Sequence, residues 1–219
     1  MAFPSYKNLN LVAVSKDIQT YWENAMTFEA SVSTREGRPP YIFFEGPPSA
    51  NGLPGIHHVM GRAIKDIFCR YKTQKGFQVK RKAGWDTHGL PVELGVEKEL
   101  GISKEDIGTT ISVDQYNAAC REAVMRYTDV WSDLTKKMGY WVDMDDPYVT
   151  YTPKYMESVW WLLKQLFDKG LIYKGYTIQP YSPKAGTGLS SHELNQPGCY
   201  QDVTDTTVTA QFKAVNDSL

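Results

Sequence analysis

The sequence predicts an α/β protein with parallel strands, and three observations support this class. An apolar run of β-favouring residues, "YIFF" at 41–44, predicts a buried strand that is stopped by Gly46 and two prolines. Apolar residues at helical spacing then follow over 59–71, and "FQVKRKAGW" at 77–85 predicts a second strand. Strand, glycine-rich turn, helix and strand form a βαβ unit, which places a ligand at the carboxyl ends of its strands.

Helices are expected on both sides of this unit. Residues 15–34 carry apolar side chains at helical spacing and begin at Ser15, a favourable N-cap residue. Residues 89–101 predict a short helix. A capping box opens a longer helix over 112–139, and a threonine cap followed by proline opens another over 152–170. We expect the aromatic residues of these last two helices to lie in the core.

Beyond residue 170 the pattern changes to short turns. Residues 171–200 predict a hairpin and a knuckle of turns, rich in glycine, proline and serine. Residues 206–215, "TTVTAQFKAV", alternate like a strand whose partner is not evident in the sequence. We therefore expect the chain to be a piece of a longer protein.

Composition indicates a globular cytoplasmic protein. Apolar residues make up 42% and charged residues 22%, and neither a bilayer-length apolar run nor a secretory signal is visible. The three cysteines form no CxxC pair, which favours reduced thiols. Between Arg62 and Lys82 there are eight basic residues and one acid. That segment is either a solvated basic face or a local field that attracts ATP or an RNA backbone.

The turn before the helix has the features of a phosphate site. Gly46, Gly52 and Gly55 allow backbone N–H groups to approach a ligand closely, and the helix start adds unsatisfied N–H groups and a positive dipole end. His57 and His58 can donate hydrogen bonds to a phosphate. The spacing is neither GxGxxG nor GxxxxGK[ST]. On the residues alone, a pair of surface histidines remains the alternative.

Three stretches together resemble a known family: "EGPPSANGLPGIHH" with the following "KDI", "AGWDTHGLPVELGVEK", and "YMESVWWLLKQLFDKGLIYKG". They are similar to the amino-terminal part of the isoleucyl-tRNA synthetases of class I, and the resemblance covers nearly the whole chain. It implies the first half of a HIGH-type, Rossmann-like nucleotide-binding fold and a small zinc-ribbon-like knuckle. The implied domains are a helical lead-in at 1–40, half of the catalytic domain at 41–170, the hairpin and knuckle at 171–200, and the start of an inserted editing domain at 201–219.

The resemblance also implies roles for individual residues. At the HIGH signature only Ile56 and His58 match, since Gly55 replaces its first histidine and His57 replaces its glycine. His58 is the expected catalytic residue. The residues expected to bind ATP are Pro48, Asn51, Gly52, Gly55, Ile56, His57 and His58. The residues expected to bind the amino acid are Gly46, Pro47 and Asp86, with Asp86 receiving the ammonium group.

Two of these roles have alternatives. The contact expected from the signature's first histidine is either lost or taken up by His57 or by a backbone N–H, and we expect His57 to point away from ATP. Asp86 is either the ammonium's partner or a cap for the turn over 87–89.

The implied reaction is ATP-dependent activation of isoleucine to an adenylate, followed by transfer to tRNA(Ile). Mg²⁺ would accompany ATP, and a monomer without a membrane partner is expected. The family's KMSKS signature does not occur in these 219 residues, so we expect the segment alone to be inactive. Ser182 and Ala185 stand where many relatives have a CxxC pair, so we expect neither zinc nor another metal site here.

Two other functions remain open at this point. Within enzymes, the chain is alternatively part of a valine or leucine synthetase or of another HIGH-type nucleotidyltransferase. From a different class, it is a non-catalytic module that binds nucleotides or RNA, to which the basic segment would contribute.

Overall fold

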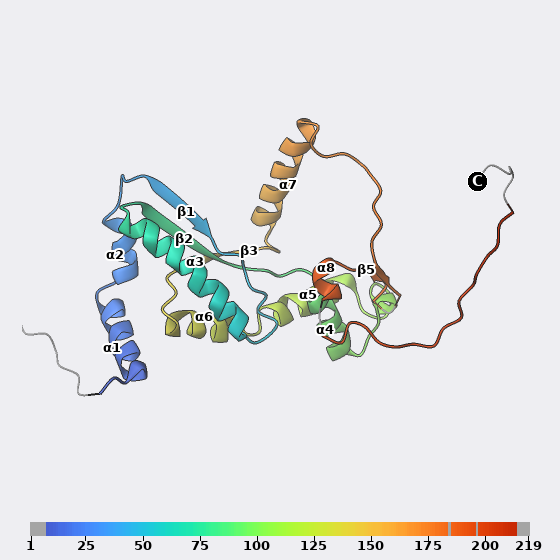
Figure 1. Ribbon diagram of the computed structural model, residues 1–219, viewed down its shortest axis with the longest axis horizontal. Helices are drawn as coiled ribbons and strands as arrows, with labels where there is room; N and C mark the ends of the chain where they lie inside the picture. Colours follow the sequence, from blue (N-terminus) through green and yellow to red (C-terminus); the bar gives the residue numbers. More distant parts are fainter. Residues whose placement is uncertain (1–7, 184, 196, 214–219) are drawn as a thin grey trace, which may run out of the picture. The chain divides into compact units, whose positions relative to one another are not determined.

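The structure is a computed structural model that describes residues 8–183, 185–195 and 197–213. These residues fall into two compact units, one within 1–172 and the other within 173–219. The first unit contains a three-stranded parallel sheet with helices, and the second contains a two-stranded hairpin and a short helix (Figure 1). No helix within the described residues is long and apolar enough to cross a membrane.

The parallel sheet is formed by β1 (Pro40–Phe44), β2 (Gln78–Trp85) and β3 (Asp143–Val149), with β2 in the centre. Both pairs are parallel. Helix α3 (Ile56–Gln74) connects β1 to β2 and packs against β2 (Figure 1). The predicted βαβ unit is therefore confirmed, and the carboxyl ends of all three strands meet at one edge of the sheet.

The amino-terminal lead-in consists of two helices, α1 (Leu11–Asn24) and α2 (Thr27–Ser33). The predicted start at Ser15 is wrong because Asn10 is the N-cap, and its side chain accepts a hydrogen bond from the N–H of residue 13. The predicted single helix is interrupted at Met26, whose φ of 44° is left-handed.

The predicted long helix over 112–139 is also divided. The capping box is confirmed, since Ser112 Oγ accepts from the N–H of Gln115 at 3.2 Å. The helix that it opens, α5 (Val113–Val124), ends early, and α6 (Thr128–Lys137) follows after a turn. The N–H of Tyr127 in this turn donates to a carbonyl of the loop after β1 instead of continuing the helix. Two shorter elements precede α5: α4 (Leu90–Leu100) and the 3₁₀ turn η1 (Lys104–Asp106).

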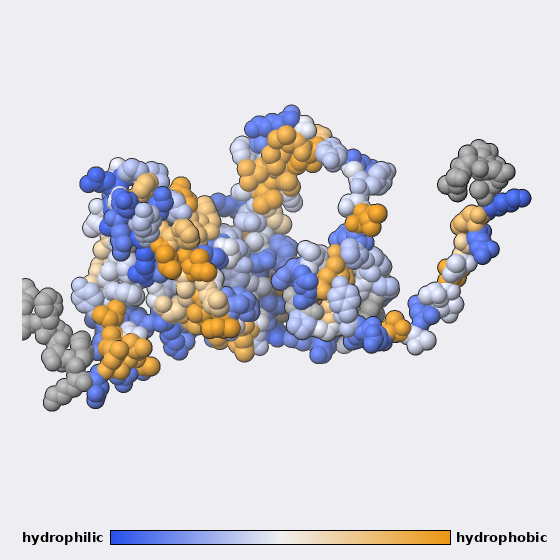
Figure 2. Space-filling model, in the orientation of Figure 1, coloured by the Kyte–Doolittle hydropathy of each residue, from blue (hydrophilic) through white to orange (hydrophobic). Residues whose placement is uncertain are grey.

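Helix α7 (Pro153–Asp168) begins after Thr152 as predicted, but its aromatic face is not in the core. Trp160 and Phe167 are 63% and 65% exposed, so the core assignment is wrong for this helix within the described residues. The side chain of Trp131, on α6, is by contrast buried. Figure 2 shows hydrophobic side chains gathered over α7.

The prediction of a fully buried first strand is likewise wrong. Alternate side chains of β1 are exposed, among them Ile42 and Phe44. Within the part of the chain that the structure describes, β1 is one of the two edge strands, and α2 and α3 make their main contacts with the central strand β2, which leaves one face of β1 uncovered. Alternation of exposure follows from the two-residue period of a strand.

In the second unit, β4 (Tyr181–Ser182) and β5 (Thr187–Gly188) pair antiparallel, and α8 (Ser191–Leu194) follows. The turn is closed by a hydrogen bond from the N–H of Ala185 to Ser182 Oγ at 3.2 Å. The strand expected over 206–215 is absent from its described residues, 206–213, and the remainder of that stretch lies outside the described residues.

We predict that Gly84→Ala destabilises the fold by about 1 to 3 kcal/mol, the range for overpacking. A Cβ at Gly84 would overlap the ring of Tyr148. That ring is held in place, because it stacks on Tyr155 at 5.5 Å and its hydroxyl donates to the carbonyl of Glu45. Urea unfolding of the protein measures the change.

The matched control is Gly61→Ala in α3, where a Cβ would meet nothing within 4 Å. That substitution should gain up to about 1 kcal/mol from helix propensity. An unchanged urea midpoint in Gly84→Ala would show that the Tyr148 ring moves freely, contrary to the prediction.

Candidate active site

The loop between β1 and α3, residues 45–55, lies at the carboxyl edge of the sheet and is fixed from three directions. Carbonyl oxygens along it accept hydrogen bonds from other elements, among them Pro48 from the N–H of Asp86 at 3.0 Å, Ala50 from the N–H of Tyr127 at 3.0 Å, and Gly52 from the indole N–H of Trp131 at 2.9 Å. The loop therefore keeps one shape without a regular ladder of its own.

Trp131 connects this loop to the helix that follows it. Its side chain is 1% exposed, and its ring meets the His58 ring edge to face with 4.7 Å between centroids. The guanidinium of Arg62 lies over the same indole at 4.9 Å and donates to Thr135 at 2.7 Å. Sequence reasoning placed Trp131 in the core correctly but gave no signal of its contact with the site.

His58 stands in the first turn of α3, with its orientation set by the backbone. Its Nδ1 accepts a hydrogen bond from the N–H of the N-cap residue Gly55 at 2.9 Å. A neutral imidazole whose Nδ1 accepts carries its proton on Nε2, so Nε2–H is the donor that the ring keeps for another partner. Burial lowers the pKa of His58, and the nearby charges of His57 and Arg62 lower it further.

The ring of His57 folds back over the N-cap instead of standing clear of it. Its Cε1 lies 2.8 Å from the position that a Cβ at Gly55 would take, and its ring centroid is 3.8 Å from that of His58. The two adjacent histidines therefore form one pair at the helix start. No hydrogen bond fixes the His57 ring among the interactions of the described residues.

Glu45 is a buried carboxylate that the sequence reasoning missed. It follows β1 directly, is 3% exposed, and accepts hydrogen bonds from Lys65 Nζ at 2.5 Å and from the hydroxyl of Tyr140. Burial and the Glu45 contact raise the pKa of Tyr140, so that phenol stays protonated. The only sequence signal was an acid placed immediately after an apolar run.

Asp86 follows β2 and lies partly exposed at the same edge. Its N–H holds the carbonyl of Pro48, and its Oδ1 accepts from the N–H of His88 at 3.4 Å. The ammonium-binding candidate thus also caps its own turn, so both roles that the sequence allowed are compatible with this geometry.

The remaining predicted residues lie on or beside the loop. Gly46 lies beside Lys65, and a Cβ added at Gly46 would be 3.4 Å from Lys65 Nζ. Asn51 accepts from the hydroxyl of Ser49 at 2.9 Å, and Ile56 is 74% exposed. Pro47, Pro48 and Gly52 occupy the same loop.

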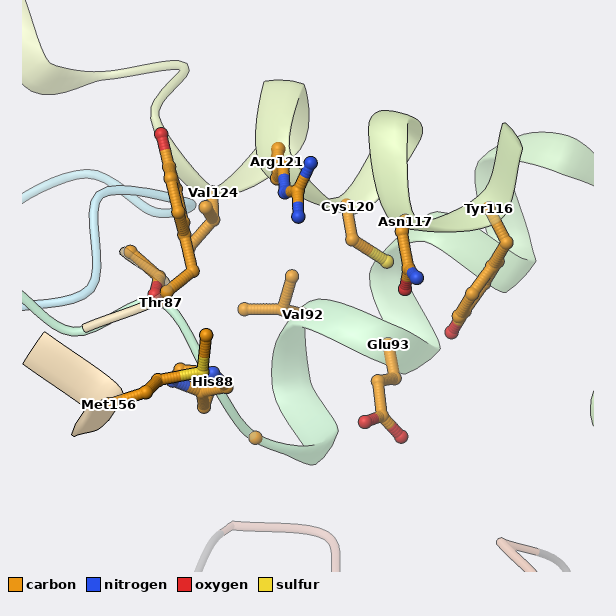
Figure 3. A pocket seen from close by; sticks show the side chains of 12 residues that line it. Thr87, His88, Val92, Glu93, Tyr116, Asn117, Cys120, Arg121, Val124 and Met156 are labelled. Atoms are coloured by element: carbon orange, nitrogen blue, oxygen red, sulfur yellow. The ribbon is translucent and has the colours of Figure 1, made fainter. Parts of the chain in front are cut away.

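A cavity of about 230 Å³ opens beside the turn that carries Asp86 (Figure 3). Thr87, His88 and Gly89 form one end of it, and the rest is formed by side chains of α4 and α5, by Tyr151 and by the start of α7. None of the residues expected to bind ATP or isoleucine lines this cavity. The candidate site is therefore the open edge formed by the loop, the start of α3 and Asp86.

The residues fit a phosphate group better than a protein-bound metal. No side-chain hydrogen bond caps the first-turn N–H groups of α3, and the Nε2–H of His58 is a further donor in the same turn. Among the described residues no group of three or more His, Cys, Asp or Glu side chains could hold a metal ion.

Comparison with known proteins identifies the family. The family model described as tRNA synthetases class I (I, L, M and V) matches residues 17–217. The chain belongs to this family. An isoleucine--tRNA ligase of Bacteroides fragilis is 70% identical over 98% of this chain. One of Streptomyces coelicolor is 47% identical over the whole of this chain. The predicted resemblance is therefore confirmed.

The solved structures agree on the fold. The agnB2 LeuRS of Agrobacterium radiobacter K84, in a ternary complex with tRNA and LeuAMS, matches 82% of this class I segment with a TM-score of 0.54 and 21% identity. The segment spans about a fifth of the curated relatives, 19% of the Bacteroides fragilis protein and 21% of the Streptomyces coelicolor protein.

We predict that the ring protons of His58 titrate with a midpoint below the ordinary value of about 6.5. The neutral ring accepts from Gly55, and burial disfavours the cation. Because the folded-state pKa is lowered, this residue's contribution to stability is present above the ordinary pKa and is lost as the pH falls toward the lowered one. NMR titration measures the midpoint, with His58→Gln assigning the signal. A midpoint at or above 6.5 would refute the buried, backbone-accepting tautomer.

Proposed function

We propose that this segment supplies the ATP-binding and isoleucine-binding half of the adenylation site in an isoleucyl-tRNA synthetase. The reaction joins the carboxylate of isoleucine to the α-phosphate of ATP with loss of pyrophosphate, and the isoleucyl group is then transferred to tRNA(Ile). The observation that carries the proposal is the start of α3, where no side-chain hydrogen bond caps the first turn and His58 keeps its Nε2–H as a donor. High identity to isoleucine--tRNA ligases supports the choice of amino acid.

His58 is the proposed donor to the phosphates. Its Nδ1 bond to Gly55 fixes both the tautomer and the direction of Nε2–H. A neutral donor at this position needs no proton transfer, so its contribution is the stabilisation of phosphate charge. Magnesium would arrive with ATP, and we name no protein ligand for it because the described residues contain no group of three or more His, Cys, Asp or Glu side chains that could hold a metal ion.

Asp86 is the proposed partner of the isoleucine ammonium group. It lies at the carboxyl end of β2, and its N–H joins it to Pro48 on the loop that carries the other half of the site. Gly46 and Pro47 lie on the same loop and would form the wall beside the isoleucine side chain. The amino-acid and ATP regions are thus linked by one backbone hydrogen bond.

For His58 we predict that replacement by alanine slows adenylate formation about ten- to a hundredfold, the equivalent of one charge-assisted hydrogen bond. The matched variant is His57→Gly. It should be milder, because no hydrogen bond orients the His57 ring in the described structure. Pre-steady-state adenylate formation by the intact synthetase that contains this segment measures both, and a larger loss from His57→Gly would reverse the two roles.

For Asp86 we predict that replacement by alanine weakens the use of isoleucine by about 1.5 to 3 kcal/mol, because the ammonium loses its charged partner. The measurement is isoleucine-dependent exchange of pyrophosphate into ATP by the intact synthetase. The KM for ATP serves as the internal control and should change little. If kcat and the KM for isoleucine both stay the same, Asp86 is only a turn residue.

A further inference from the structure

We propose that Thr150 is a positioning residue for Asp86 and thereby for the ammonium group of the amino acid. The inference rests on the proposed role of Asp86. Thr150 lies one residue beyond β3, is 8% exposed, and was not singled out by the sequence. Its N–H donates to the carbonyl of Trp85, the last residue of β2, at 3.2 Å. This contact places Thr150 beside the turn that begins with Asp86.

The hydroxyl of Thr150 makes three contacts with the two residues that follow Asp86. Its Oγ1 accepts from the N–H of Thr87 at 3.0 Å, pairs with Thr87 Oγ1 at 2.7 Å, and pairs with His88 Nδ1 at 3.0 Å. A hydroxyl offers one donor and two acceptor positions. The three contacts therefore use the full capacity of the hydroxyl, and all of it is directed at one turn.

The contacts of Thr150 with Thr87 Oγ1 and with His88 Nδ1 depend on each other, because the Thr150 hydroxyl has a single proton. One acceptor position of Thr150 is taken by the Thr87 N–H, so its single proton goes either to Thr87 Oγ1 or to His88 Nδ1. The other partner must then donate. Neither contact survives in a residue without a hydroxyl, because such a residue supplies no acceptor and no donor.

Asp86 itself is held between two anchors. On one side its N–H is tied to Pro48, and on the other the next two residues are tied to Thr150. The N–H of His88, part of the anchored turn, also reaches Asp86 Oδ1 at 3.4 Å. Position and direction of the carboxylate thus depend on Thr150, the residue directly after β3, which is not among the predicted amino-acid-binding residues. Figure 3 shows Thr87 and His88 at the adjoining end of the cavity.

The two substrates, isoleucine and ATP, distinguish a positioning role of Thr150 from a general structural one. A misplaced carboxylate affects the amino acid, whereas ATP is held by the loop and the start of α3. Loss of the Thr150 hydroxyl should therefore raise the KM for isoleucine and leave the KM for ATP nearly unchanged. The effect should also require Asp86, since Thr150 acts only through it.

The test is a double-mutant cycle on isoleucine-dependent pyrophosphate exchange by the intact synthetase. We expect Thr150→Val to raise the KM for isoleucine about five- to twentyfold, and Thr150→Ser, which keeps the hydroxyl, to stay within about twofold of the unsubstituted enzyme. In an Asp86→Ala background, Thr150→Val should add less than about twofold. The full Thr150→Val effect in that background, or an equal rise in the KM for ATP, overturns the proposal.

Two further variants keep the test decisive. Thr87→Val removes the partner hydroxyl and should show the same dependence on Asp86, so it replaces Thr150→Val if that variant does not fold. Thr73→Val removes another buried threonine hydroxyl, far along the chain in α3, and should leave the KM for isoleucine unchanged. If Thr73→Val raises it equally, the effect is one of general stability and the proposal fails.

The outcomes also separate this inference from the proposed function. If Asp86→Ala alone leaves the use of isoleucine unchanged, the assignment of the ammonium site is wrong. If Asp86→Ala impairs the use of isoleucine while Thr150→Val and Thr87→Val do not, the site stands and the positioning role of Thr150 is rejected.

Discussion

The hydrogen bond from the Trp131 indole to the carbonyl of Gly52 is the contact on which the candidate site depends most. It joins α6 to a loop that has no regular structure, and the same indole ring supports His58 and carries Arg62. A buried indole N–H needs a partner, so the ring cannot shift without leaving that donor unsatisfied. Loop shape, histidine orientation and the position of α6 are therefore coupled through one side chain.

The basic residues between Arg62 and Lys82 stabilise the fold, whether or not they also contact a ligand. Four of the eight basic residues between Arg62 and Lys82 pair with carboxylates of the protein: Lys65 with Glu45, Arg70 and Arg81 with Asp66, and Lys82 with Asp146. Buried partners such as Glu45 would be costly without these bonds. Much of the basic segment is thus committed internally, which weakens the case for a separate RNA-binding face.

Local sequence signals predicted the elements whose boundaries are marked by capping residues, glycine or proline. The apolar run before Gly46, the capping box at Ser112 and the proline after Thr152 each marked a boundary that the structure contains. Strand β3 was missed because "DMDDPYV" is acidic and contains proline. Its pairing is completed by contacts with β2, including Asp146 with Lys82, and such contacts are not visible in local propensity.

The residues of the candidate site also fall into those that local sequence signals could identify and those that depend on distant contacts. Residues within one stretch, such as Gly55 and His58, could be named from the sequence, and Asp86 could be added from the family resemblance. Trp131, Glu45 and Thr150 could not, because their partners lie 79, 95 and 63 residues away. The helix break before α6 has the same cause, since Tyr127 donates to the distant loop.

The two residues at the start of α3 that differ from the HIGH signature, Gly55 and His57, are in steric contact. Position 55 is the N-cap and position 57 lies in the first turn, so a ring at 57 can fold back over the cap. In this chain it does so, and it occupies the space that a side chain at 55 would need. A side chain at position 55 would therefore require the His57 ring to move. The glycine at 55 thus leaves room for the His57 ring in the position that it takes.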